Sequence, residues 1–308
     1  MVIVDSYSTS TTRNVPAAPS SEFNIAAAGD WDCNLNTKDT VDNIVERNPE
    51  VVLGLGDYIY YEKSADCWLD IVEPLKQIMK IVIGNHETEI PTILNQIIDD
   101  FEIDYFGVGG QYYYSFDYRN VHFIVMSDFA PNSSEESLQT YKEGSKQYNF
   151  VKNDLAKSSA DPQIDWIIVS HHIQQYASSE NEVIHTVDEW PRIYHPLFTM
   201  YNVDLVLQGH QHNYQRTYPI KYNVENPEMP IITDGSKNSY TSMTGQIFVT
   251  AGTAGASLQD LVGIAPYIVT EHVGYGFIDI SLIDDGATLN AKFYDNDGTV
   301  KDEFTITK

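Results

Sequence analysis

The chain has 308 residues, 42% of them hydrophobic, which suffices for one large domain or two small ones. Its formal net charge of −26 at pH 7 argues against binding to nucleic acid or anionic membranes, and an anionic substrate would need cations at its binding site. No run of about eighteen apolar residues is present, so we expect no membrane segment in this chain.

The N-terminal part of the chain differs in composition from the rest. Residues 5–21 are rich in Ser, Thr, Pro and Ala, which predicts a flexible segment over 1–22. The basic and then apolar pattern of a signal peptide is missing, so any signal or anchor is expected upstream of Met1. We expect residues 23–308 to form a single domain, because no further linker-like composition follows.

Three strand–helix units open this domain. The predicted strands are 23–28, 51–55 and 81–83, with helices between them from about residue 38 and over 65–76. Asp30, Asp57 and Asn85 follow these strands at intervals of 27 and 28 residues. That interval is one step of a parallel sheet, so the three side chains should meet in one cleft. Any one of them alone would more often be a turn or a helix cap.

The later elements are predicted from the same kinds of pattern. Helices are expected over 93–101, 138–157 and, in part, 187–201. An antiparallel hairpin is expected over 111–117 and 121–126. Two apolar strands are expected over 165–169 and 203–208. Beyond Pro219, strands at 246–250, 276–282, 287–294 and 303–307 suggest a second, mostly antiparallel sheet that closes the same domain.

The two cysteines, Cys33 and Cys67, each follow a predicted strand end in neighbouring strand–helix units. They could approach each other as a disulfide, which we favour, or remain two free thiols. A disulfide would fit an exported protein in an extracellular or periplasm-like compartment, whereas free thiols would fit a cytosolic one.

Histidines follow both of the apolar strands. His171 and His172 come after the first, and His210 and His212, one residue apart, come after the second. Neutral imidazole is a common ligand of Zn, Fe and Mn ions, so these side chains could reach a metal centre. The alternative for the last two is a pair of surface histidines.

Together the residues at these strand ends form a mixed set of oxygen and nitrogen ligands. The set is Asp30, Asp57, Tyr60, Asn85, one of His171 or His172, His210 and His212. It suits a pair of divalent or trivalent cations better than one structural zinc ion, which would prefer cysteines. Two cations can hold a phosphoryl group and lower the pKa of a bound water, and they would offset the acidic surface.

Five short motifs in this order resemble those of the calcineurin-like metallophosphoesterases, and the purple acid phosphatase branch most closely. They are Gly-Asp-Trp-Asp at 29–32, Gly-Asp-Tyr-Ile-Tyr at 56–60, Gly-Asn-His-Glu at 84–87, Val-Ser-His-His at 169–172 and Gly-His-Gln-His at 209–212. The resemblance implies an α/β metallophosphoesterase fold, a four-layer αββα sandwich of two mixed sheets flanked by helices. Residues 23–308 would then be the catalytic domain.

The resemblance also implies roles for these residues. A first metal, typically Fe(III), would be held by Asp30, Tyr60 and His212. The Tyr60 tyrosinate bound to Fe(III) would give a purple colour. Asn85, His210 and the strand-end histidine would hold a second, either Fe, Zn or Mn, and Asp57 would bridge the two. Hydroxide held by the metals would attack phosphorus. His86 would stabilise the transition state or protonate the leaving oxygen. His185 is either a further histidine of the pocket or an exposed loop residue.

The chain departs from the family pattern at two positions. Asp32 stands where glycine is usual and could add a ligand or, as we favour, bond nearby backbone. Gln174 stands where proline is usual. Counting along the fourth motif from Trp166 and to Tyr176 favours His172 over His171 as the ligand.

The resemblance therefore predicts a dinuclear-metal hydrolase that cleaves small phosphomonoesters, as an acid phosphatase does. A phosphodiesterase or nucleotide hydrolase on the same site is the nearest alternative. A catalytically silent binding protein of the same fold is a further one, which the loss of a ligand would favour. The oligomeric state is not predicted.

Overall fold

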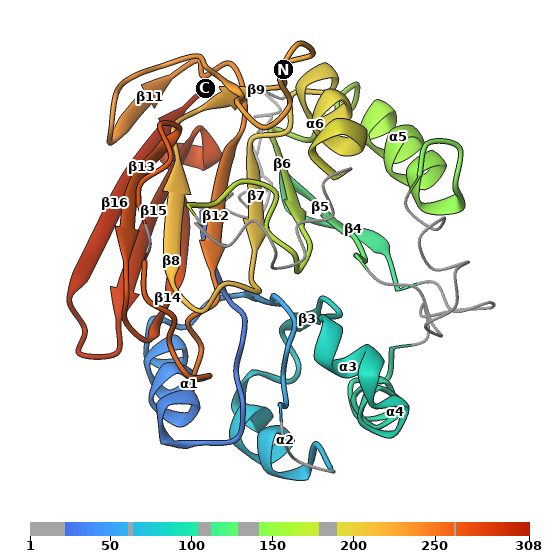
Figure 1. Cartoon of the computed structure of the whole chain (residues 1–308), viewed down its shortest axis with the longest axis vertical. Coiled ribbons are helices and arrows are strands. Elements are labelled where there is room, and N and C mark those ends of the chain that lie inside the picture. The colour runs from blue at the N-terminus through green and yellow to red at the C-terminus, as the bar shows by residue number, and fades with distance from the viewer. Residues whose placement is uncertain (1–21, 61–63, 104–111, 129–141, 179–189, 262) are drawn as a thin grey trace, which may run out of the picture.

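The computed structural model describes residues 22–60, 64–103, 112–128, 142–178, 190–261 and 263–308. Two seven-stranded sheets lie face to face, with helices α1 (Leu35–Arg47) and α2 (Asp66–Val72) on one side and α5 (Lys146–Ser158) and α6 (Trp190–Met200) on the other (Figure 1). This is the predicted four-layer α/β arrangement, and the predicted fold class is confirmed. The predicted N-terminal segment lies outside the described residues apart from Glu22.

The first sheet combines the two ends of the chain. Its strands, in spatial order, are β11 (Ser239–Thr241), β16 (Val300–Thr307), β15 (Thr288–Asp295), β14 (Gly276–Ile283), β1 (Phe23–Ala28), β2 (Val51–Gly54) and β3 (Met79–Ile81). The expectation that the C-terminal strands form a sheet of their own is therefore wrong. Strand β14 pairs antiparallel with β1, with Ile280 opposite Ile25, and this gives β1 a partner on its second edge.

The second sheet carries the histidine strands. Its order is β13 (Ile268–His272), β8 (Tyr214–Thr217), β12 (Ile247–Ala251), β7 (Leu205–Gln208), β6 (Trp166–Ser170), β5 (Val121–Val125) and β4 (Tyr114–Tyr118). Strands β5, β6, β7 and β12 are parallel, and β4 forms the predicted hairpin with β5. A short ribbon of β9 (Ile220–Lys221) and β10 (Ile231–Ile232) stands apart.

Alternate residues of the central strands serve two different cores. In β1, Ile25 and Ala27 face the other sheet, whereas Ala26 and Ala28 pack under the helices beside β1. In β6, Ile168 faces the first sheet and Ile167 packs with α5 and α6. Burial on both faces explains why these strands are mostly apolar.

Helix caps account for two differences from the predicted boundaries. Helix α1 begins at Leu35, earlier than predicted, because the Asn34 side chain accepts a hydrogen bond from the Thr37 N–H at 3.1 Å. Helix α5 begins at Lys146, later than predicted, because Ser145 caps it through the Tyr148 N–H. The part of the chain that the structure describes also contains α3 (Asn85–Glu89), α4 (Pro91–Asp100) and the short 3₁₀ turns Glu73–Leu75 and Asp284–Gly286. Among the described residues, none of the helices is both long and apolar enough to span a membrane.

A disulfide joins Cys33 to Cys67, as we favoured, and links the loop before α1 to the first turn of α2 across 34 residues of sequence. Closing a loop of this length restricts the unfolded chain, so the double variant Cys33→Ser/Cys67→Ser should lose roughly 2–4 kcal/mol of unfolding free energy. Urea denaturation of both proteins measures this loss, with thiol titration of the unfolded wild type as the control. Equal free energies of unfolding would contradict the prediction.

His122 on β5 lies between two carboxylates, with Nδ1 2.6 Å from Asp117 and Nε2 2.9 Å from Asp154. Burial alone would lower the pKa of His122, but the hydrogen bonds with Asp154 and Asp117 outweigh it and raise the pKa above 6.5. A raised folded-state pKa stabilises the protein below the unfolded-state pKa, and this contribution is lost as pH rises through the folded-state pKa.

The free energy that His122→Gln removes should therefore be larger at pH 5.5 than at pH 9. Urea denaturation of wild type and variant at the two pH values gives this difference. The same loss at both values would mean that the charge of His122 contributes nothing.

Candidate metal centre

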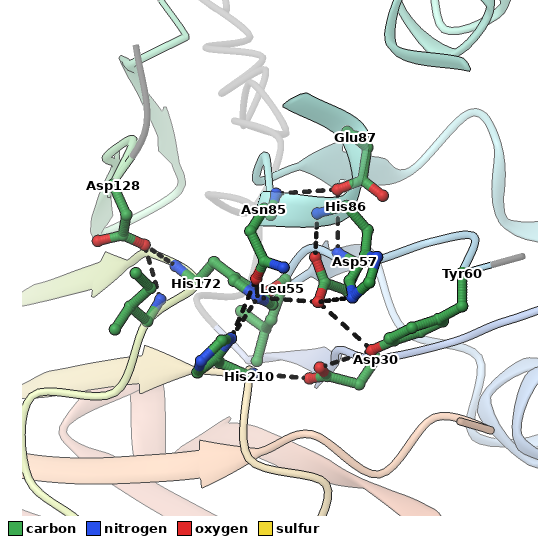
Figure 2. A network of polar contacts seen from close by, with 12 residues as sticks. Asp30, Leu55, Asp57, Tyr60, Asn85, His86, Glu87, Asp128, His172 and His210 are labelled. Carbon is green, nitrogen blue, oxygen red and sulfur yellow. Dashed lines mark hydrogen bonds and ion pairs between the residues drawn. The ribbon is translucent and has the colours of Figure 1, made fainter. Parts of the chain in front are cut away.

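The predicted ligand residues come together at the carboxyl ends of strands from both sheets. Asp30 and Asp57 follow β1 and β2, and Asn85 opens α3 just beyond β3. The histidines come from the facing sheet, after β6 and β7, so the candidate ligands gather between the two sheets (Figure 2).

Three of these side chains form what we term the first ligand group: Asp30, Tyr60 and His212. The Tyr60 hydroxyl lies 2.9 Å from Asp30 Oδ1 and 3.0 Å from His212 Nε2. His212 Nε2 is also 3.2 Å from Asp30 Oδ1. A carboxylate, a phenol and an imidazole thus converge on one point.

Three others form the second ligand group: Asn85, His172 and His210. Asn85 Oδ1 lies 3.2 Å from His172 Nε2 and 3.1 Å from His210 Nδ1. The two ring nitrogens are 3.2 Å apart. This group also consists of atoms that can each donate a lone pair to a cation.

Asp57 belongs to both groups. Its Oδ2 lies 3.2 Å from His172 Nε2 and 3.4 Å from the Tyr60 hydroxyl (Figure 2). Burial alone would raise the pKa of Asp57, but the charges and hydrogen bonds of His172 and His86 hold it at about 2. Asp57 is therefore an ionised carboxylate, 2% exposed, that lies between the two ligand groups.

The outer nitrogens of two histidines show that this set fits metal ions. His172 Nδ1 lies 2.7 Å from the Leu55 carbonyl, and His212 Nδ1 lies 2.7 Å from the Ser257 carbonyl. A carbonyl only accepts, so each Nδ1 donates, and in the neutral ring the lone pair is on Nε2, toward the centre. Nitrogen and oxygen ligands about 2.0–2.2 Å from one ion lie about 3 Å from each other, as the atoms of both groups do.

The backbone at the ligands is held in an unusual conformation. Asp30, Asp57 and His210 have positive φ angles of 60°, 54° and 70°. Such conformations are disfavoured for residues with a Cβ, and they persist where the surrounding structure enforces them. A side chain at Gly84 would collide with the Asp57 carboxylate, which explains the glycine before Asn85.

Glu87 is a supporting residue that the sequence analysis did not identify. Its buried carboxylate accepts hydrogen bonds from the N–H groups of Asp57 at 3.0 Å, Tyr58 at 2.7 Å and Gly84 at 2.9 Å. It thereby ties the loop after β2 to the loop after β3. The sequence feature that could have identified Glu87 is its position three residues after Gly84, which is the capping-box position of α3.

The remaining predicted residues have different positions. The His86 N–H donates to Asp57 Oδ1 at 3.0 Å, and its ring, 27% exposed, lies 4.3 Å from the ring of Tyr60. His171 is buried, with Nδ1 3.4 Å from Asp128, while the neighbouring His172 faces the centre. His185 lies outside the described residues.

The two departures from the family pattern do not add to the centre. Asp32 Oδ1 accepts from the Cys33 N–H at 2.8 Å, the local backbone bond that we favoured. Gln174 is 2% exposed, and neither of these residues has a described contact with the ligands.

Comparison with known proteins places these motifs in a family. A family model described as calcineurin-like phosphoesterase matches residues 23–214. Probable inactive purple acid phosphatase 27 of Arabidopsis thaliana is 26% identical over a 312-residue alignment, which covers 93% of this chain and 47% of the relative. Purple acid phosphatase 18 of the same plant is 30% identical over 226 residues, covering 69% of this chain and 49% of the relative.

A solved structure shares the fold. Purple acid phosphatase PPD1 from yellow lupin (Lupinus luteus) seeds aligns with a TM-score of 0.72 at 23% identity, covering 94% of this chain and 54% of that one. The chain thus spans about half the length of these relatives. The family model covers more than half of the chain, and it includes all five motifs. The chain therefore belongs to the calcineurin-like phosphoesterase family, with purple acid phosphatases among its relatives.

Proposed function

We propose that this chain carries the active site of a dinuclear-metal hydrolase that cleaves phosphomonoesters, in the manner of a purple acid phosphatase. The observation that carries the proposal is the pair of ligand groups that share Asp57. Every position that the family motifs require has a residue able to bind a metal, and the relatives named as purple acid phosphatases support the same activity.

The first ligand group and Asp57 would hold one cation, and the second group and Asp57 the other. When bound, the two cations supply the positive charge that attracts a phosphoryl group and acidifies a water molecule. The chain itself keeps the Asp57 carboxylate ionised and directs the Nε2 lone pairs of His172 and His212 toward the centre. His86, partly exposed beside Tyr60, is placed to donate a proton to the leaving oxygen or to stabilise the transition state.

Tyr60 favours Fe(III) at the first site. Burial and the charges of Asp30 and Asp57 raise the pKa of Tyr60 well above its ordinary value, so the hydroxyl keeps its proton in the metal-free protein. A strongly charged cation would displace that proton and bind the phenolate. The second group, with two imidazoles and an amide, suits Fe, Zn or Mn.

The substrates would be small phosphorylated molecules, because the acidic surface disfavours nucleic acid. The Cys33–Cys67 disulfide favours an oxidising compartment, extracellular or periplasm-like. A catalytically silent protein of the same fold is the second candidate, favoured by the name of the relative described as a probable inactive purple acid phosphatase. The complete ligand set of this chain argues against it.

The test is a comparison of kcat/KM for an aryl phosphomonoester and an aryl phosphodiester, on metal-loaded protein, from pH 4.5 to 8. The proposal predicts the higher value for the monoester, with the maximum at acid pH. A higher value for the diester would replace it with a phosphodiesterase. If protein that holds two ions hydrolyses neither compound, the result would favour a catalytically silent protein of the same fold.

A further inference from the structure

Asp128 lies three residues beyond β5, next to His172 of the second ligand group, and it belongs to none of the five motifs. Strand β5 pairs in parallel with β6, and the Met126 N–H donates to the Ser170 carbonyl at 2.8 Å. The residues after the two strands are thereby brought side by side. Asp128 is 4% exposed, so its carboxylate has been removed from water at this position.

The Asp128 carboxylate holds the backbone of His172. Its Oδ2 accepts hydrogen bonds from the His172 N–H at 2.6 Å and from the Ile173 N–H at 2.7 Å. Its Oδ1 lies 3.4 Å from His171 Nδ1. In Figure 2, Asp128 lies on the side of His172 opposite to Asp57 and Tyr60, so it supports the ligand from behind.

The ring of His172 is fixed at a second point by the Leu55 carbonyl, which accepts from Nδ1 at 2.7 Å. With the backbone held by Asp128 and the ring held by Leu55, Nε2 is directed at Asn85 Oδ1 and Asp57 Oδ2, each 3.2 Å away. Partners of this kind orient metal ligands and tune their affinity.

Asp128 is in turn positioned by α5. The Gln147 side chain accepts from the Ser127 N–H at 2.8 Å and donates to the Ser127 carbonyl at 2.8 Å. Gln147 is 2% exposed and donates also to the Tyr194 hydroxyl at 3.4 Å. The outer helix layer thus holds the backbone of Ser127, and the next residue along the chain, Asp128, holds the backbone of His172.

From these contacts we propose that Asp128 is a positioning residue for the second metal site, acting through His172. The inference rests on the proposed metal centre and deepens it, since it assigns a supporting residue to one of the two sites. Asp128 contacts no member of the first ligand group among the described hydrogen bonds and ion pairs, so its effect should be confined to one ion.

The test is a Zn²⁺ titration of the metal-free full chain against a chromophoric chelator. Asp128→Ala should weaken one of the two bound ions about 10–100-fold and leave the other unchanged. Asp128→Asn keeps an oxygen that can accept from both N–H groups, so it should restore most of that affinity. Gln147→Leu, which touches no ligand, should weaken the same ion in the same direction but less, and it remains informative if Asp128→Ala does not fold.

Asp204→Ala is the matched control. Asp204 is 6% exposed and accepts from the Ile167 N–H at 2.9 Å, so it holds β6 at its opposite end. This variant should lose stability and keep both ions. Wild-type affinity for both ions in folded Asp128→Ala would overturn the inference and leave the phosphatase proposal intact. Because the titration does not use hydrolysis, a wild type that binds two ions without cleaving phosphate would defeat only the proposed function.

Discussion

Asp57→Ala is expected to lower kcat for phosphomonoester hydrolysis on the order of 10³-fold or more, the largest effect of any single substitution at this centre. The Asp57 Oδ2 lies against both ligand groups, 3.2 Å from His172 Nε2 and 3.4 Å from the Tyr60 hydroxyl. Its removal takes a negative charge from between two cations, so both ions should bind more weakly. Steady-state kinetics together with metal analysis measures the two losses.

The exposed Asp70 on α2 provides the control, because Asp70→Ala removes a carboxylate that has no described hydrogen bond or ion pair with a candidate ligand. Asp57→Ala should keep the far-ultraviolet circular dichroism of the wild type, since the two-sheet core does not depend on this side chain. Wild-type turnover in folded Asp57→Ala would show that the shared carboxylate is not part of the reaction.

Tyr60→Phe is expected to abolish the visible absorption band of the Fe(III)-loaded protein. The phenol oxygen lies 2.9 Å from Asp30 and 3.0 Å from His212, where it would be a ligand of the first ion, and phenylalanine has no oxygen to bind. In the proposed centre this band would come from the Tyr60 phenolate bound to Fe(III), so its loss should be complete. A visible spectrum of each protein at equal iron content is the measurement.

Tyr58→Phe is the matched control for this prediction. Tyr58 is fully buried two residues away, and its hydroxyl lies 2.8 Å from the carbonyls of Gly54 and Val82, away from the ligand groups. This variant should lose about 1 kcal/mol of stability for the missing hydrogen bond and keep the band. A band of wild-type intensity in Tyr60→Phe would remove Tyr60 from the list of iron ligands.

The local patterns in the sequence were sufficient for the strands that position the centre. Largely apolar runs followed by Asp or His mark β1, β2, β6 and β7, because buried parallel strands need apolar residues on both faces. The pairing of β14 with β1 was not predictable, since it joins residues about 250 positions apart and leaves no local signal.

The supporting residues of the centre were harder to identify than the ligands. Asp128 follows a hairpin strand and belongs to no recognisable motif, and its role depends on β5 and β6 being neighbours. Glu87 stands inside a motif, but its hydrogen bonds to Asp57 and Tyr58 cross between two loops. Sequence patterns report which residues can bind a metal, whereas the groups that orient them are defined by tertiary contacts.

The most direct test of the proposed function follows one sample of the protein through metal removal and replacement. Hydrolysis of an aryl phosphomonoester at acid pH is measured as purified, after dialysis against a chelator, and after two equivalents of metal are restored. We predict turnover in the first state, its loss in the second and its recovery in the third. Turnover that survives complete removal of metal would contradict a metal-dependent reaction, and its absence from protein in which both ions are bound would contradict the phosphatase activity.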